Sequence, residues 1–289
     1  MNPHLEINNL LLIYGINKIK SPKVKTFILS IFGGLIISLG AFISSVISYG
    51  FSDGKARFMM GLVFPTGYIT AYCCGAEVIT GDFLLIYNLF KPGVIWYQIL
   101  IHLLIVLVGN FIGALIMSLL IVYSHLPNTF QIFLAKVLME TGIEKCTLKF
   151  GESCAKGILA NFFICFSYFS GIWGKYLRGV IFYMWATIFV VGALNLEDCI
   201  SDLFYIFTGI FTCHEYNLDR TNLTFGRLFY KSLLPILLGD IIGGGFLVGL
   251  VYCDSVQVIE EKITNDNVND TSCDNMNSRA NLERGQIIN

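Results

Sequence analysis

A polar break, Cys74-Gly75-Ala76-Glu77-Val78-Ile79-Thr80-Gly81-Asp82, interrupts a long apolar run, and a similar break occurs a second time. The second copy reads Leu196-Glu197-Asp198-Cys199-Ile200-Ser201-Asp202. In both copies a glutamate is followed by four residues and then by an aspartate. Ionisable groups at membrane depth are costly, so they are rare and mark a transport pathway by default. A duplicated polar break is typical of transporters built from internal repeats.

The composition indicates an integral membrane protein. Of 289 residues, 55% are hydrophobic and 13% are charged, and the mean hydropathy is +0.69. Soluble domains carry about 25% charged residues. The net charge of −1 gives no basic surface for a nucleic-acid partner. The nine cysteines lie mostly in apolar runs without the paired spacing of a zinc site, so we expect no metal, no cofactor and no disulfide framework.

Apolar segments of sufficient length occur six times along the chain. A transmembrane helix needs about 20 predominantly apolar residues. The expected spans are residues 26–49, residues 58 to the first break, residues 96–123, residues 154–172, residues 179 to the second break, and residues 232–253. Short apolar pieces follow the two breaks, at residues 83–90 and 203–211. A polar connector from Ser124 to about Glu152 separates the first three spans from the last three.

This order predicts two repeats, at about residues 26–123 and 154–253, within a six-span pore domain of residues 26–253. Because three spans is an odd number, the second repeat must insert with the opposite orientation. The third and sixth spans also share a motif, beginning Gly109-Asn110 and Gly239-Asp240, whose small residues we expect to allow close helix packing. We therefore predict an all-α membrane protein with six transmembrane helices in two inverted repeats and interrupted second and fifth helices.

The segments outside this domain differ in charge. Residues 1–25 contain four lysines, and the turn after the fourth span carries Lys175 and Arg178 on the same expected side. The positive-inside rule makes that side cytoplasmic, although Lys55, Arg57 and Lys145 fall on the other side and weaken the bias. We expect cytoplasmic N- and C-termini, a plasma-membrane location, and a disordered polar tail over residues 254–289.

The interrupted helices also indicate where the functional site should lie. The unpaired backbone groups of a broken helix are tolerated only against protein or a water-filled cavity. Half-helix N-termini carry partial positive charge, which favours an anion. Two such breaks related by an inverted repeat should meet near the bilayer midplane and form one central site there.

Four motifs of the sequence resemble those of the formate/nitrite transporter family. Gly75-Ala76-Glu77-Val78-Ile79-Thr80-Gly81 resembles the first signature of that family, and Lys156-Gly157-Ile158-Leu159-Ala160-Asn161 resembles its G-I-L-A-N motif. Lys18, followed by Lys25-Thr26-Phe27, resembles its N-terminal lysine segment, and Lys145 precedes Phe150 and Glu152 as in a further family motif. The resemblance extends from about Lys18 to Cys253.

The resemblance implies an aquaporin-like fold, a homopentamer with one pore per protomer, and transport of small weak acids such as formate, nitrite, hydrosulfide or lactate, usually with a proton. It also assigns roles to individual residues. Thr80 is the threonine of the first break, Asn161 supports the central site, Lys18 and Lys145 are vestibule lysines, and Phe64 belongs to the constriction. The second constriction residue is either Phe189 or Val191, because direct counting lands on Val191 and the aromatic lies nearby.

The second break departs from the family pattern. Asp198 stands where the family usually has histidine, Asp202 where it has asparagine, and Asp82 where it tends to have threonine or asparagine. The four histidines, His4, His102, His125 and His214, all lie outside the breaks. An ionised carboxylate repels an anion strongly in low dielectric, and burial favours the neutral acid. We therefore expect Asp198 to be largely neutral near pH 7, to handle protons, and to let the substrate pass as its neutral acid.

Several alternatives stay open. Glu77 and Glu197 either accept freed backbone N–H groups or contact the substrate directly, and Lys18, Lys145 and Phe64 also fit ordinary interfacial or packing roles. The acidic centre favours, as an alternative, a pore for neutral or cationic small solutes. The lost histidine favours, as a second alternative, a non-conducting membrane scaffold. An enzyme is disfavoured because the sequence shows no nucleophile–base pair.

Overall fold

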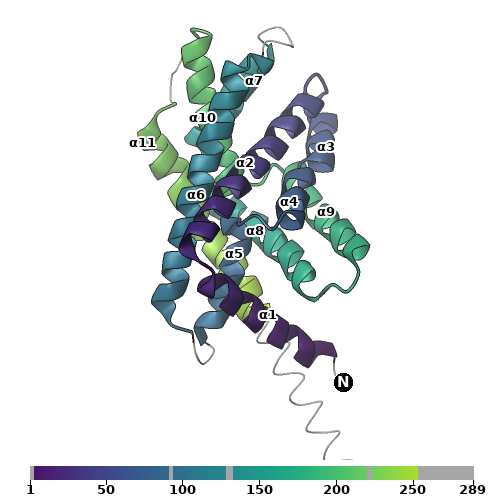
Figure 1. Ribbon diagram of the computed structural model, residues 1–289. Coiled ribbons are helices and arrows are strands. Elements are labelled where there is room, and N and C mark those ends of the chain that lie inside the picture. Colours follow the sequence, from purple (N-terminus) through teal and green to yellow (C-terminus); the bar gives the residue numbers. More distant parts are fainter. Residues whose placement is uncertain (1–2, 91–93, 128–132, 220–222, 253–289) are drawn as a thin grey trace, which may run out of the picture.

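The computed structural model describes residues 3–90, 94–127, 133–219 and 223–252, which form helices and turns without a strand (Figure 1). The predicted all-α class is confirmed for these residues. Four helical segments among them are long and apolar enough to cross a membrane: Lys23–Ser48, Trp96–Tyr123, Phe150–Trp173 and Phe225–Val251. Ile79–Leu89 and Leu177–Ala193 are shorter apolar helices.

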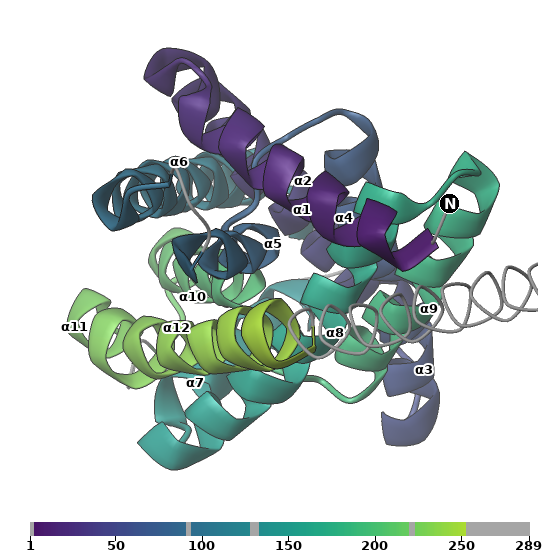
Figure 2. The same ribbon diagram turned by 90° about the horizontal axis from the view of Figure 1, so that it is seen from below.

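The helices of the first half are α1 (Pro3–Lys20), α2 (Lys23–Ser48), α3 (Asp53–Val63), α4 (Pro65–Cys73), α5 (Ile79–Asp82), the 3₁₀ helix η1 (Phe83–Phe90) and α6 (Trp96–Tyr123). Those of the second half are α7 (Phe133–Thr147), α8 (Phe150–Trp173), α9 (Leu177–Ala193), α10 (Cys199–Glu215), α11 (Phe225–Arg227), the π-helix η3 (Leu228–Leu233), α12 (Leu234–Asp240) and the π-helix η4 (Ile241–Tyr252). Seen from below, α5 and α10 lie inside a ring that includes α2, α6, α8 and α12 (Figure 2).

Glycines allow the long helices to approach closely, as the sequence predicted. On α6, a Cβ atom at Gly113 would collide with the Ile31 carbonyl oxygen of α2. In the second half, a Cβ atom at Gly243 would collide in the same way with the Ile158 carbonyl oxygen of α8. Small residues at such crossings let backbones pack without side chains between them.

The two breaks have the same backbone geometry. Helix α4 is followed by Gly75 at φ 67°, and the next residue, Ala76, donates its N–H to the Ala71 carbonyl at 2.9 Å. Helix α9 is followed by Asn195 at φ 49°, and Leu196 donates its N–H to the Val191 carbonyl at 3.0 Å. A left-handed residue of this kind is a common way to end a helix, and here it separates α4 from α5 and α9 from α10.

Several segments contain more helix than the sequence analysis described. The polar connector contains a whole helix, α7, with Leu134 and Leu138 buried. The N-terminal segment folds as α1 and packs against α8 and η1. The piece after the second break extends over all of α10, and the second span is divided once more where Pro65, which has no N–H, begins α4. The predicted tail at residues 254–289 lies outside the described residues.

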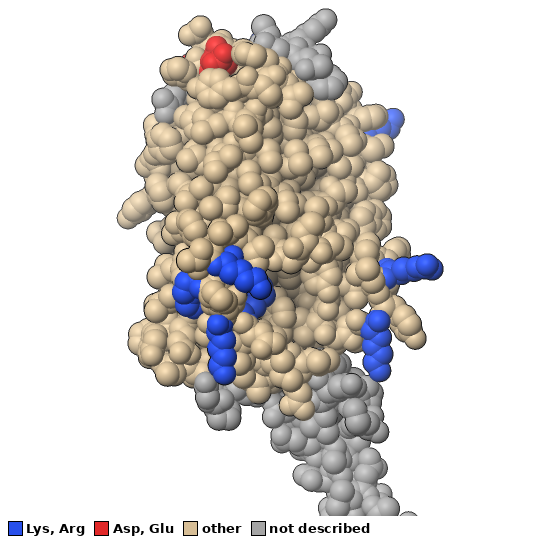
Figure 3. All heavy atoms as spheres, viewed as in Figure 1, with Lys and Arg blue, Asp and Glu red and all other residues tan. Residues whose placement is uncertain are grey.

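The surface fits a membrane environment. On the face shown in Figure 3, most Lys and Arg side chains lie towards the α1 end, and an acidic side chain lies at the opposite end. Most of the surface between them carries no charge. Large apolar side chains are exposed on several helices, including Phe182 at 69% and Leu120 at 59%. Such an uncharged apolar belt suits lipid and partner subunits better than water.

Candidate functional site

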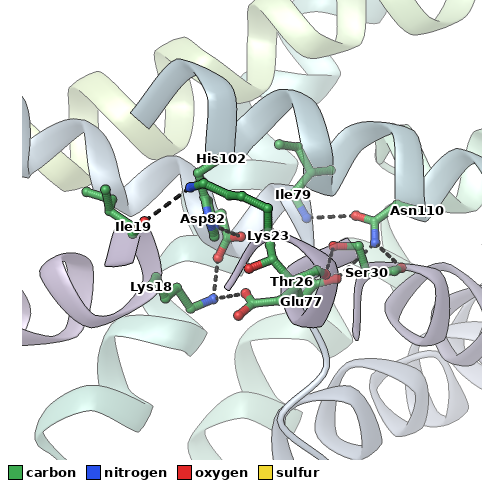
Figure 4. Close-up of polar contacts among 10 residues, drawn as sticks. All are labelled: Lys18, Ile19, Lys23, Thr26, Ser30, Glu77, Ile79, Asp82, His102 and Asn110. Atoms are coloured by element: carbon green, nitrogen blue, oxygen red, sulfur yellow. Dashed lines mark hydrogen bonds and ion pairs between the residues drawn. The ribbon is translucent and has the colours of Figure 1, made fainter. Parts of the chain in front are cut away.

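Lys18, at the end of α1, joins the two acids of the first break (Figure 4). Its Nζ donates to Glu77 Oε2 at 2.5 Å and also to an oxygen of Asp82. The other Asp82 oxygen lies 3.0 Å from His102 Nε2, which comes from α6. The Tyr14 ring lies under the same ammonium, with its centroid 5.0 Å from Nζ. We call Lys18, Glu77, Asp82 and His102 the first cluster.

Lys18 remains a cation in this setting. Burial alone lowers the pKa of its ammonium group, but the negative charges of Asp82 and Glu77 outweigh this effect and hold the pKa well above its ordinary value. Glu77, Asp82 and His102 each offer one potential metal-ligand atom, and these atoms lie within 4.8 Å of one another, a spacing that suits a metal ion. Lys18 Nζ already contacts both carboxylates, so an ammonium group lies between Glu77 and Asp82.

Lys145, near the end of α7, holds the acids of the second break. Its Nζ donates to Glu197 Oε2 at 2.9 Å and lies 3.3 Å from Asp202 Oδ1. Lys156 of α8 reaches the other Glu197 oxygen at 3.4 Å. We call Lys145, Lys156, Glu197 and Asp202 the second cluster. The two predicted vestibule lysines thus occupy matching places beside the two breaks, on α1 and α7, which lie at opposite ends of the molecule (Figure 1).

The glutamates of the breaks contact lysines. The sequence left two roles open for Glu77 and Glu197, namely accepting freed backbone N–H groups or contacting substrate. In the structure both side chains pair with lysines. The Glu77 backbone N–H itself donates to the Leu29 carbonyl of α2 at 3.2 Å.

Asn110 satisfies the freed backbone of the first break, a role that the sequence reasoning missed. Its Oδ1 accepts the Ile79 N–H at the start of α5 at 2.9 Å. Its Nδ2 donates to the carbonyls of Ser30 at 2.7 Å and Glu77 at 2.9 Å. The signal was present, because Asn110 follows Gly109 in the duplicated motif of the third and sixth spans. In the second copy of the motif, Asp240 donates no such bond, but its carbonyl accepts from Asn161 Nδ2 at 2.8 Å.

Asp198 lies at the N-terminus of α10. Its Oδ2 accepts the Ser201 N–H at 2.9 Å, which is the usual bond of an N-cap residue. Its Oδ1 is buried and has no hydrogen-bond partner among the described residues. Tyr68 of α4 faces this carboxyl group and also faces Thr80 of α5. These three side chains come from both halves of the chain, and we call this group the central site.

A cavity adjoins the central site on the α7 side. Its lining combines residues of both repeats: Met60, Phe64, Lys145, Val191, Gly192, Asn195, Leu196, Ser201 and Tyr205. Of the two candidates for the second constriction residue, Val191 is 1% exposed and lies in this cavity with Phe64. Phe189 packs elsewhere, with its ring 5.7 Å from Phe58 and 5.5 Å from Trp185, because two residues along a helix turn a side chain to another face.

A second hollow lies on the α1 side of the molecule. It is lined by Leu10, Ile13, Tyr14, Asn17, Tyr72, Tyr168, Gly171 and Ile172. Tyr14 contacts Lys18 of the first cluster, so this hollow leads towards that cluster. The central site therefore has a cavity with a lysine on one side and a hollow beside a lysine on the other.

Sequence comparison identifies relatives over most of the chain. The family model described as Formate/nitrite transporter matches residues 6–253. The formate channel FocA of Escherichia coli (strain K12) is 29% identical over 252 residues, which cover 82% of this chain and 88% of that protein. A formate-nitrite transporter of Entamoeba histolytica is 25% identical over 251 residues, which cover 85% of this chain and 68% of that protein.

Structure comparison agrees on the fold. A pentameric formate channel with formate bound superposes with a TM-score of 0.70 at 20% identity, covering 80% of this chain and 96% of that chain. An ion channel of the same transporter family superposes with a TM-score of 0.73 at 16% identity, covering 88% and 98%. At these identities the likeness shows a shared fold.

Proposed function

Because this chain belongs to the formate/nitrite transporter family, we propose that it moves small monovalent weak acids, such as formate, nitrite and lactate-like monocarboxylates, across a membrane. Transport is coupled to a proton, and the substrate passes the centre as its neutral acid. The relatives named above are channels and transporters, which supports transport over catalysis.

We propose the full predicted architecture as the frame for this activity. It comprises six spans over residues 26–253 in two inverted repeats, cytoplasmic termini, a homopentamer in the plasma membrane and one pore in each protomer. The matching breaks, the matching glycine contacts of Gly113 and Gly243, and the matching lysine clusters support the repeats. The pentameric assembly of a structural neighbour and the exposed apolar belt support the oligomer.

The observation that carries the proposal is the Asp198 carboxyl group. It is fully buried, its Oδ2 caps α10, and its Oδ1 is left without a hydrogen-bond partner in the described part of the chain. Ionised, it would repel a monovalent anion 4 Å away by about 4 kcal/mol at an effective dielectric constant of 20. A proton shared between Asp198 and the substrate removes this repulsion. Asp198 thereby supplies the proton handling that an imidazole supplies elsewhere in the family.

The first and second clusters lie at the two ends of the proposed transport path. Lys18 and Lys145 place one ammonium group beside each break, and carboxylates of the same break hold each ammonium group in position. The anion then takes up a proton before it reaches the apolar constriction at Phe64 and Val191.

The test is a flux panel in proteoliposomes comparing formate, lactate, nitrite and ammonium at several pH values. We expect uptake of the weak acids to rise as the pH falls, because a larger fraction of each is then the neutral acid. Uptake of ammonium with little flux of the acids would favour the alternative of a pore for neutral or cationic solutes. The buried carboxyl groups of Asp198, Asp202 and Asp240 are the observation that supports this alternative. No flux from a well-assembled oligomer would favour the scaffold.

The Asp198→Asn variant isolates proton handling from structure. Asparagine caps a helix about as well as aspartate does, so the bond to the Ser201 N–H is kept while the titrating group is lost. We expect weak-acid flux to fall at least tenfold and its pH dependence to flatten. The Asp198→Ala variant, which also loses the cap, serves as the structural comparison. An unchanged rate and pH profile in Asp198→Asn would remove Asp198 from the mechanism.

A further inference from the structure

We infer that Tyr68 is a specificity-determining residue whose hydroxyl, together with that of Thr80, binds the carboxyl group of a short monocarboxylic acid beside Asp198. This inference rests on the function proposed above and deepens it, because it names the group that the central site recognises. The sequence analysis assigned Tyr68 no role, since a tyrosine within an apolar run fits ordinary core packing.

The position of Tyr68 on α4 places it between the two cavities. Phe64, Tyr68 and Tyr72 are spaced four residues apart, so they lie on one face of the helix. Phe64 lines the cavity on the α7 side, and Tyr72 lines the hollow on the α1 side. Tyr68 lies between them, with its ring centroid 5.8 Å from that of Phe64. A solute crossing from one side to the other passes this residue.

Polar atoms converge at this point with only loose contacts to one another. The Tyr68 hydroxyl lies close enough to interact with both Asp198 and Thr80, and all three residues are fully buried. None of these contacts reaches hydrogen-bond geometry, because Tyr68 OH, Thr80 Oγ1 and Asp198 Oδ1 each lack a partner that meets it among the described residues. Buried polar groups are nearly always well paired, and those that are not call for an explanation such as a ligand. Three neighbouring groups with loose mutual contacts indicate a site that a polar solute completes.

The equivalent positions of the other repeat are apolar. When the two breaks are aligned on Glu77 and Glu197, Thr80 corresponds to Ile200, Tyr68 to Ile188, and Asp198 to Val78. All three apolar counterparts are buried in the same hydrophobic core. One set of equivalent positions is therefore polar (Tyr68, Thr80 and Asp198), and the other set is apolar (Ile188, Ile200 and Val78).

This pairing of sets matches the chemistry of a short monocarboxylic acid. Its carbonyl oxygen accepts hydrogen bonds from the hydroxyls of Tyr68 and Thr80. Its acidic proton is shared with Asp198 Oδ1, so no new charge appears in the low-dielectric centre. Its hydrogen or short carbon chain contacts Val78, Ile188 and Ile200 without leaving a polar group unpaired.

The experiment measures formate flux in proteoliposomes against concentration for wild type and Tyr68→Phe, which removes one oxygen and keeps the ring. We expect the half-saturating concentration to rise about three- to tenfold, as for the loss of one buried hydrogen bond, with the maximal rate within about twofold of wild type. Thr80→Val, nearly equal in size, should shift the same quantity in the same direction. Tyr87→Phe, a buried tyrosine on η1 outside the site, is the matched control and should leave it unchanged.

Each outcome bears on one claim. A half-saturating concentration that does not move in Tyr68→Phe overturns the inference, as does a fall in maximal rate alone, which is the mark of a structural role. Size-exclusion chromatography of the detergent-solubilised oligomer confirms that each variant is assembled. If wild type moves no weak acid, the proposed function itself fails. If wild type moves formate and Tyr68→Phe moves it equally well, only the assignment of Tyr68 fails.

Discussion

In the first cluster, the side chains of Lys18 and Glu77 remain 14% and 11% exposed, whereas in the second cluster those of Lys145 and Glu197 are 2% and 1% exposed. Each cluster contains a lysine, a glutamate and an aspartate, and these residue types therefore meet in two different environments. Lys18 comes from a terminal helix, α1, that packs on the outside of the bundle. Lys145 comes from α7, one face of which packs along α10, and its side chain belongs to the buried face of that helix.

The two clusters also balance their charge differently. Lys156 brings a second lysine to the second cluster, where it lies 3.4 Å from Glu197, and it also lies 3.6 Å from Glu152 of its own helix. The first cluster has one lysine for Glu77 and Asp82, and the second partner of Asp82 is His102. The second cluster therefore contains two lysines, whereas the first cluster contains one lysine and one buried imidazole.

The largest expected effect is the loss of Lys145. We expect Lys145→Met to lower the free energy of unfolding by about 3–5 kcal/mol, because removing one partner of a buried ion pair leaves uncompensated charge on the others. Thermal unfolding of the purified protein in detergent measures it. Lys156→Met is the matched control: its side chain is 26% exposed, so we expect a loss of about 1 kcal/mol or less. Equal losses in the two variants would contradict the contrast between a buried and a partly exposed lysine.

Much of this comparison was predictable from the sequence. The spacing of Glu77 and Asp82 recurs in Glu197 and Asp202, and an odd number of spans per repeat implies two opposed halves. The closely packed glycines, such as Gly113, followed from their repeated spacing. These features are readable because membrane insertion forces apolar runs and makes every polar interruption informative.

The partners within each site were less predictable, for physical reasons. His102 lies in a continuous apolar run, and only the packing of α6 on α5 brings it to Asp82. Tyr68 looked like a core residue for the same reason. The choice between Phe189 and Val191 depended on the register of α9, which sequence spacing alone does not fix. Helix α7 was missed because its polar residues resemble those of a connector, although Lys145 is buried.

The next largest effect concerns Lys18. We expect Lys18→Met to lower the free energy of unfolding by about 1–3 kcal/mol, less than Lys145→Met, because water reaches the remaining Glu77 carboxylate and lowers the cost of its charge. We also expect faster hydrogen exchange along α1, since the lysine joins this helix to the first break. Lys20→Met, an exposed position on the same helix, should change neither quantity. Unchanged exchange in Lys18→Met would show that α1 is held by its apolar contacts alone.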